Sequence, residues 1–107
     1  MKLELHGAVL SEDLPAIYAF IARDNPDAAE RGLAAVRLTF DLIAREPGCG
    51  IVYPARNPQL RDARMLPINR FPNYLVFYRV EADTVRVLYV VHGARHLPRL
   101  FRLEPRD

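Results

Sequence analysis

The sequence contains one cysteine, one lysine among its fifteen lysines and arginines, and no long apolar run. Because Cys49 is the only cysteine, an intramolecular disulfide is excluded, and a reducing compartment is compatible with the composition. No apolar run approaches the roughly 20 residues that a membrane helix needs. The segment MKLELHGAV also lacks the apolar region of a signal peptide. We therefore expect a cytoplasmic protein with no membrane contact.

The 107 residues that are present suffice for one domain that buries a core without disulfides or metal. The formal net charge of +2 hides an asymmetry, because residues 1–50 carry five basic and eight acidic side chains, whereas residues 51–107 carry ten and five. Arginine grips phosphates and carboxylates with paired hydrogen bonds, but a GC-rich genome also supplies it by codon bias. The asymmetry predicts a basic face, built by the second half, that attracts nucleic acid or an acidic protein.

Two amphipathic helices are predicted in the first half of the chain. Ser11 or Asp13 is a plausible cap for the first helix, which must end at Asn25-Pro26 because the residue before proline resists helical backbone. Asn25 can cap the second helix, which begins at Pro26 and ends before Pro47. Almost no linker separates the helices, so they should form an antiparallel hairpin.

The remaining segments predict a sheet. Lys2–His6 alternates polar and apolar residues as a short strand does, residues 47–63 are punctuated by glycine and proline as a surface loop, and residues 64–69, 74–81 and 84–92 are strand-like. A short turn at Ala82-Asp83 joins the last two strands as a hairpin. The order β-α-α-β-β-β predicts a single α+β domain in which a helical hairpin packs on a mainly antiparallel sheet.

The apolar stripes of the helices have no other surface to cover in so small a domain. We expect them to face the strand residues Phe77, Val87 and Tyr89. The helix residues expected in this interface are Leu14, Ile17, Ile21, Leu33, Val36, Phe40 and Ile43.

The last strand ends abruptly in VLYVVHGARHLPRLF, where an apolar run gives way to glycine, histidines and arginines. Gly93 lets the chain leave the strand without a Cβ clash. This change predicts an exposed basic site built from Arg64, Arg79, His92, Arg95 and Arg99, although a strand terminus with a soluble tail explains it as well. His92 and His96 are four residues apart, but Gly93 opposes a helix that would aim both at a metal, so we expect neither metal nor cofactor.

Three segments in this order resemble the RelE/ParE superfamily of bacterial toxins. They are DLPAIYAFIARDNPDAAERGLAAV at residues 13–36, LPINRFPNYLVFYRV at residues 66–80 and VLYVVHGARHLPRLF at residues 87–101. The resemblance covers most of the chain. It implies a βααβββ toxin of a type II toxin–antitoxin system, bound and neutralised by a cognate antitoxin in a hetero-oligomer.

The superfamily has two activities, and the residues bear on the choice between them. RelE-like members cut messenger RNA on the ribosome, which requires proton transfer and cations around the phosphate. In that case His92 would transfer the proton and Arg64 and Arg79 would hold phosphate. ParE-like members inhibit DNA gyrase, and the lack of lysine after Lys2, the His-Gly-Ala-Arg ending and the long apolar hairpin favour this activity.

Two alternatives to gyrase inhibition stay open. One is the RelE-like ribosome-dependent endoribonuclease, with the ribosome and mRNA as partners. The other is a decayed toxin that survives only as an antitoxin-binding or DNA-binding module. In the inhibitor hypothesis, Arg64, Arg79, His92, Arg95 and Arg99 contact gyrase or the antitoxin.

Overall fold

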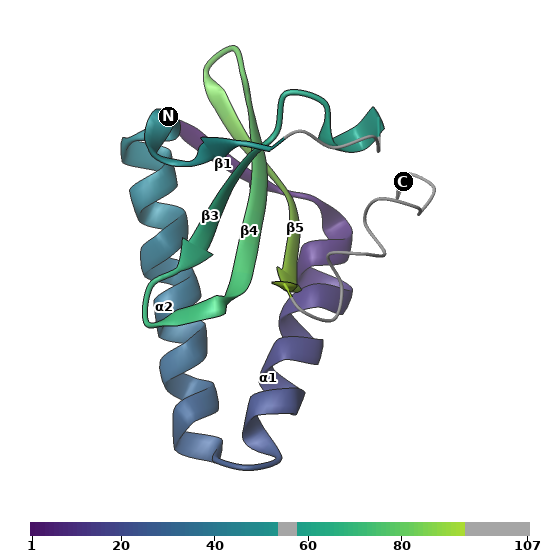
Figure 1. Ribbon diagram of the computed structural model, residues 1–107, viewed down its shortest axis with the longest axis vertical. Helices are drawn as coiled ribbons and strands as arrows, with labels where there is room; N and C mark the ends of the chain where they lie inside the picture. Colours follow the sequence, from purple (N-terminus) through teal and green to yellow (C-terminus); the bar gives the residue numbers. More distant parts are fainter. Residues whose placement is uncertain (54–57, 94–107) are drawn as a thin grey trace.

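The computed structural model describes residues 1–53 and 58–93, which form a helical hairpin lying against one sheet (Figure 1). In chain order the elements are β1 (Lys2–Leu5), η1 (Val9–Asp13, a π-helix), α1 (Leu14–Ala22), α2 (Pro26–Arg45), η2 (Pro47–Cys49), β2 (Ile51–Val52), η3 (Pro58–Leu60), β3 (Arg64–Ile68), β4 (Phe71–Glu81) and β5 (Thr84–His92). The predicted α+β architecture is confirmed.

The sheet has the strand order β1-β5-β4-β3-β2. β5 pairs with β4 in antiparallel and with β1 in parallel orientation, because the helical hairpin carries the chain away from β1 before it returns. The remaining pairs are antiparallel, as predicted. The two-residue strand β2 lies inside the segment that the sequence predicted to be a loop, and it extends the sheet beyond β3.

The junction between the helices follows the predicted capping pattern. The Asn25 side chain accepts a hydrogen bond from the Ala28 N–H at 3.1 Å, and Pro26 begins α2, where a missing N–H costs little. Gly32 lies where α2 passes α1, since a Cβ there would be 3.2 Å from the Ile21 side chain. The cap and the glycine together allow α1 and α2 to lie side by side (Figure 1).

The start of the first helix differs from the prediction. Neither Ser11 nor Asp13 caps it, because a π-helix already spans Val9–Asp13 and runs directly into α1. The Asp13 carboxylate instead accepts a hydrogen bond from the Val90 N–H at 3.0 Å. Val90 lies beyond Val87, the last β5 residue paired with β1, so this carboxylate satisfies a backbone donor that the shorter strand leaves open.

The strands β4 and β5 are apolar on both faces, and each face belongs to a separate core. We call these the helix-side core and the outer core. The helix-side core consists of Val9, Ile17, Ala35, Val36, Phe40, Ile43, Ile68, Tyr74, Val76, Tyr78, Val85, Val87 and Val90. The outer core consists of Leu60, Ala63, Leu75, Phe77, Leu88, Tyr89 and Val91.

A β-bulge decides which side chains of β5 meet the helices. Phe77 is paired with Tyr89 and Tyr78 with Val87, so Leu88 is an extra residue and the alternation reverses after it. The prediction that Phe77 and Tyr89 face the helices is therefore wrong, since both lie in the outer core, whereas Val87 does face them. A strict period of two cannot reveal this reversal.

Most of the helix residues that were expected in the interface do lie there. Ile17, Val36, Phe40 and Ile43 are buried in the helix-side core, and Leu14 and Ile21 pack against it while partly exposed. Leu33 is only half-buried.

Replacing Phe40 with alanine should lower the free energy of unfolding by about 3–5 kcal/mol, because the ring is buried and its removal leaves a cavity. Urea denaturation monitored by circular dichroism measures the change. Leu38→Ala is the matched control on the same helix, and its exposed side chain predicts a change within about 0.5 kcal/mol. Equal losses for the two variants would contradict this packing.

Candidate functional site

His92 ends β5 opposite Tyr74, and its half-buried ring lies on the helix side of the sheet. The ring meets Tyr74 edge-to-face at 5.1 Å between centroids and Phe20 of α1 at 6.3 Å. Its Nδ1 atom is buried and has no hydrogen-bond partner among the described residues. His92 thus packs its ring against two aromatic side chains, as a structural residue does.

Arg64 begins β3 and is tied to the backbone of the preceding segment. Its Nη1 donates a hydrogen bond to the Gly50 carbonyl oxygen at 2.7 Å. This bond fastens the chain just before β2 to β3, so the guanidinium has a clear structural task.

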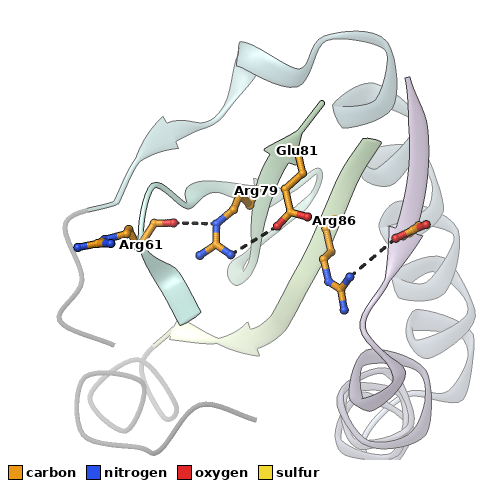
Figure 2. A network of polar contacts seen from close by, with 5 residues as sticks. Arg61, Arg79, Glu81 and Arg86 are labelled. Carbon is orange, nitrogen blue, oxygen red and sulfur yellow. Dashed lines mark hydrogen bonds and ion pairs between the residues drawn. The ribbon is translucent and has the colours of Figure 1, made fainter. Parts of the chain in front are cut away.

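Arg79 lies on the outer face of β4 and is held from two sides (Figure 2). Its Nε donates to the Arg61 carbonyl oxygen at 2.8 Å, and its Nη1 lies 3.6 Å from the Glu81 carboxylate. On the neighbouring strand, Arg86 pairs with Glu4 at 3.9 Å. These pairs are exposed to partly exposed and individually weak, but they show that Arg79 fixes the segment that covers the outer core.

The structure does not bring the three predicted residues together. Arg64 is paired with Tyr78 and shares its helix-side face, whereas Arg79, the next residue of β4, points to the outer face. His92 is paired with Tyr74, four residues along the strand from Tyr78, which corresponds to about 13 Å. The other two predicted residues, Arg95 and Arg99, lie outside the described part of the chain.

A buried tyrosine that is not among the predicted site residues joins the segment after α2 to the sheet. The Tyr78 hydroxyl donates to the Pro47 carbonyl oxygen at 2.8 Å and accepts from the Gly50 N–H at 2.8 Å. A Cβ at Gly50 would lie 2.6 Å from that hydroxyl, so only glycine fits there. Burial raises the pKa of Tyr78 to about 12, with a smaller raising contribution from Cys49.

The sequence also did not predict a hollow beside α2. It has a volume of about 460 Å³ and lies between the helix and the two-residue turn that joins β3 to β4. Its lining residues are Arg31, Ala34, Ala35, Leu38, Asn69, Arg70 and Phe71. The only sequence signal was Leu38, an apolar residue on the polar side of the helical stripe.

Comparison with known proteins decides the family. Residues 8–97 match the family described as "ParE toxin of type II toxin-antitoxin system, parDE". The chain belongs to the ParE toxin family. It is 32% identical over 87 residues to the protein named "Putative toxin Y4kP" from Sinorhizobium fredii, covering 81% of this chain and 83% of that protein.

A solved structure shares the fold of this ParE-family chain. It is described as "Chromosomal ParDE TA system from P. aeruginosa", and the superposition has a TM-score of 0.67 at 19% identity. The match covers 86% of this chain and 95% of that one. At this identity the likeness establishes the fold, which agrees with the two helices and five-stranded sheet described above.

Two further observations concern metals and membranes. Within residues 1–53 and 58–93, no three His, Cys, Asp or Glu side chains gather where they could hold a metal ion. In the same ranges, no helix is both long and apolar enough to cross a membrane.

Replacing Tyr78 with phenylalanine should lower the free energy of unfolding by about 1–3 kcal/mol, because the buried Gly50 N–H and the Pro47 carbonyl lose their partner. The pKa of Tyr78 is raised from 10.0 to about 12 in the folded protein. The protonated hydroxyl therefore makes its full contribution to the free energy of unfolding below pH 10, and this contribution is lost as the pH rises through 12. Urea unfolding at pH 8 and above pH 10 should therefore show a smaller difference between wild type and variant at the higher pH. Tyr18→Phe, which removes an exposed bond to Glu30, is the control and should cost less at pH 8; an equal cost there would argue against the junction.

Replacing His92 with phenylalanine should leave stability unchanged or raise it by about 1 kcal/mol, because it keeps the aromatic contacts and removes a buried, unpaired nitrogen. His92→Ala should instead cost about 1–3 kcal/mol through lost contacts with Phe20 and Tyr74. Thermal and urea unfolding measure both variants. A large loss for His92→Phe would mean that the imidazole nitrogens make an essential bond.

Proposed function

We propose that this ParE-family toxin acts in the cytoplasm by binding and inhibiting DNA gyrase, and that a cognate antitoxin neutralises it by binding. The observation that carries the proposal is the separation of Arg64, Arg79 and His92. An inhibitor acts through a surface and needs no convergence of these side chains on one point.

Cleavage of RNA makes a stricter geometric demand. A proton-transfer group and the cations that stabilise the phosphate must converge on one reacting centre within hydrogen-bonding reach. Arg64 and Arg79 lie on opposite faces of the sheet, and His92 lies about 13 Å along the strands from Arg64. Each arginine also holds a backbone carbonyl, which favours a structural task over phosphate binding.

The charge distribution supports a protein partner. Residues 51–107 carry ten basic and five acidic side chains, and an acidic antitoxin would be attracted to that half of the chain. The solved relative is described as a ParDE toxin–antitoxin system, so its description pairs a toxin with an antitoxin. Binding of a protein partner does not require the predicted contact residues to share one site. These residues are Arg64, Arg79, His92, Arg95 and Arg99.

The purified protein should inhibit the supercoiling of relaxed plasmid by DNA gyrase and leave messenger RNA intact on translating ribosomes. Prior addition of the antitoxin should restore supercoiling. His92→Phe should inhibit gyrase as strongly as wild type, because phenylalanine keeps the ring that packs on Phe20 and Tyr74 and the proposal requires no proton transfer.

Opposite results would identify the alternatives. Ribosome-dependent RNA cleavage that His92→Ala slows by about 10²–10⁴-fold would replace gyrase inhibition with an endoribonuclease. Antitoxin binding without either activity, together with normal growth on induction, would indicate a decayed toxin.

A further inference from the structure

The hollow beside α2 has the size and the lining of a small-molecule site. Its volume of about 460 Å³ lies within the roughly 300–1,000 Å³ of ligand pockets, which combine apolar walls with a few polar groups that orient the ligand. Leu38 on the apolar side is 58% exposed, so this surface is accessible within the described part of the chain. The apolar lining consists of Ala34, Ala35, Leu38 and Phe71, and the polar lining of Arg31, Asn69 and Arg70.

Phe71 supplies an aromatic ring to the hollow. It begins β4 and is half-buried, and its ring lies close to α2 at Gly32, where a Cβ would be 3.8 Å from two ring carbons. A planar base can stack on the accessible part of an aromatic ring, and such stacking tolerates every base because each has a π-face.

The turn across the hollow from α2 supplies a free side-chain amide. The Asn69 N–H donates to the Thr39 hydroxyl oxygen at 3.3 Å, and this hydroxyl donates to the Ala35 carbonyl oxygen at 2.8 Å, which ties the turn to the helix. The Asn69 side-chain amide has no hydrogen-bond partner among the described residues. A carboxamide offers a donor and an acceptor together, the pair of groups that matches the edge of adenine.

Arg70 occupies the same turn at a backbone angle that usually selects glycine. Its φ is 68°, in the left-handed region that is unfavourable for residues with a Cβ. A non-glycine residue in such a position is a reason to look for a function of its side chain. The side chain of Arg70 lines the hollow.

Two arginines of the hollow have guanidinium groups to spare. Arg31, on α2, and Arg70, on the turn, have neither a hydrogen bond nor an ion pair among the described residues. A guanidinium group binds phosphate through paired, charge-assisted hydrogen bonds. The hollow therefore combines an aromatic ring, a free carboxamide and two cations.

We propose that this hollow binds a nucleotide. The base stacks on Phe71 beside Leu38, the Asn69 amide pairs with the edge of the base, and Arg31 and Arg70 hold the phosphate. The ring and the carboxamide favour a nucleotide over a simple carboxylate, which needs neither of them. This inference does not depend on the proposed inhibition of gyrase.

The first test uses isothermal titration calorimetry of the full chain with adenosine monophosphate. We expect a dissociation constant of about 1 mM or tighter. Adenosine and ribose 5-phosphate should each bind at least about 10-fold more weakly, because the first lacks the phosphate and the second lacks the base. N-acetylglutamate tests whether any small carboxylate suffices, and it should also bind more weakly.

A second test compares matched variants. Arg70→Gly removes a guanidinium and relieves the left-handed backbone, so it should be at least as stable as wild type in urea yet bind the nucleotide about 10-fold more weakly. Ala82→Gly relieves the same kind of backbone at φ 53° in the turn between β4 and β5, away from the hollow, and should leave affinity unchanged. Arg31→Gln should weaken binding, whereas Arg37→Gln, on the same helix but outside the lining, should not.

Three results would overturn the inference. They are no heat of binding with adenosine monophosphate at about 10 mM, N-acetylglutamate binding as tightly as the nucleotide, and equal nucleotide affinity in wild type and all four variants. Tighter binding of a single-stranded oligonucleotide, weakened by Arg70→Gly and Arg31→Gln alone, would support the site and identify a nucleic-acid strand as the source of the nucleotide.

Discussion

The constraint on which the rest of this fold depends is that β4 and β5 are apolar on both faces. Each face must be covered, because exposed rows of valine, phenylalanine and tyrosine would cost the free energy that folding gains from burial. The helical hairpin covers one face, and Leu60 and Ala63 pack against the other. A chain of this length therefore builds two thin cores on one sheet instead of a single thick one.

Polar groups lie where the covering segments meet the sheet. The Tyr78 hydroxyl fastens the end of the helical hairpin on one side, and Arg79 fastens the segment after η3 on the other through the Arg61 carbonyl (Figure 2). Such groups pair with backbone carbonyls and amides that strand pairing leaves open. Their arrangement follows from the needs of folding, and it leaves Arg64 and Arg79 occupied.

The arginines in the described part of the chain differ in what their side chains contact. The exposed side chains of Arg31 and Arg70 line the hollow beside α2 and have no ion pairs among the described residues. Arg64 and Arg79, by contrast, each donate a hydrogen bond to a backbone carbonyl.

Periodicity and capping chemistry alone determined the α+β class, both helices and the three long strands. These signals are local, since Asn25-Pro26 stops one helix and starts the next whatever lies beyond. Family membership could also be anticipated, from three segments whose order and spacing resemble known toxins. Local signals were misleading at Asp13, which looks like a cap but bonds to a strand far away in sequence.

Only the tertiary structure decided which residues share a surface. The bulge at Leu88 reverses the alternation of β5, so Tyr89 faces away from the helices, and no period-two pattern contains that information. Pairing register placed Arg64, Arg79 and His92 apart, and the Thr39–Asn69 bond brought Arg70 close to α2. Sequence patterns specify local alternation and helix ends, whereas the bulge and the relative placement of the elements depend on packing between distant segments.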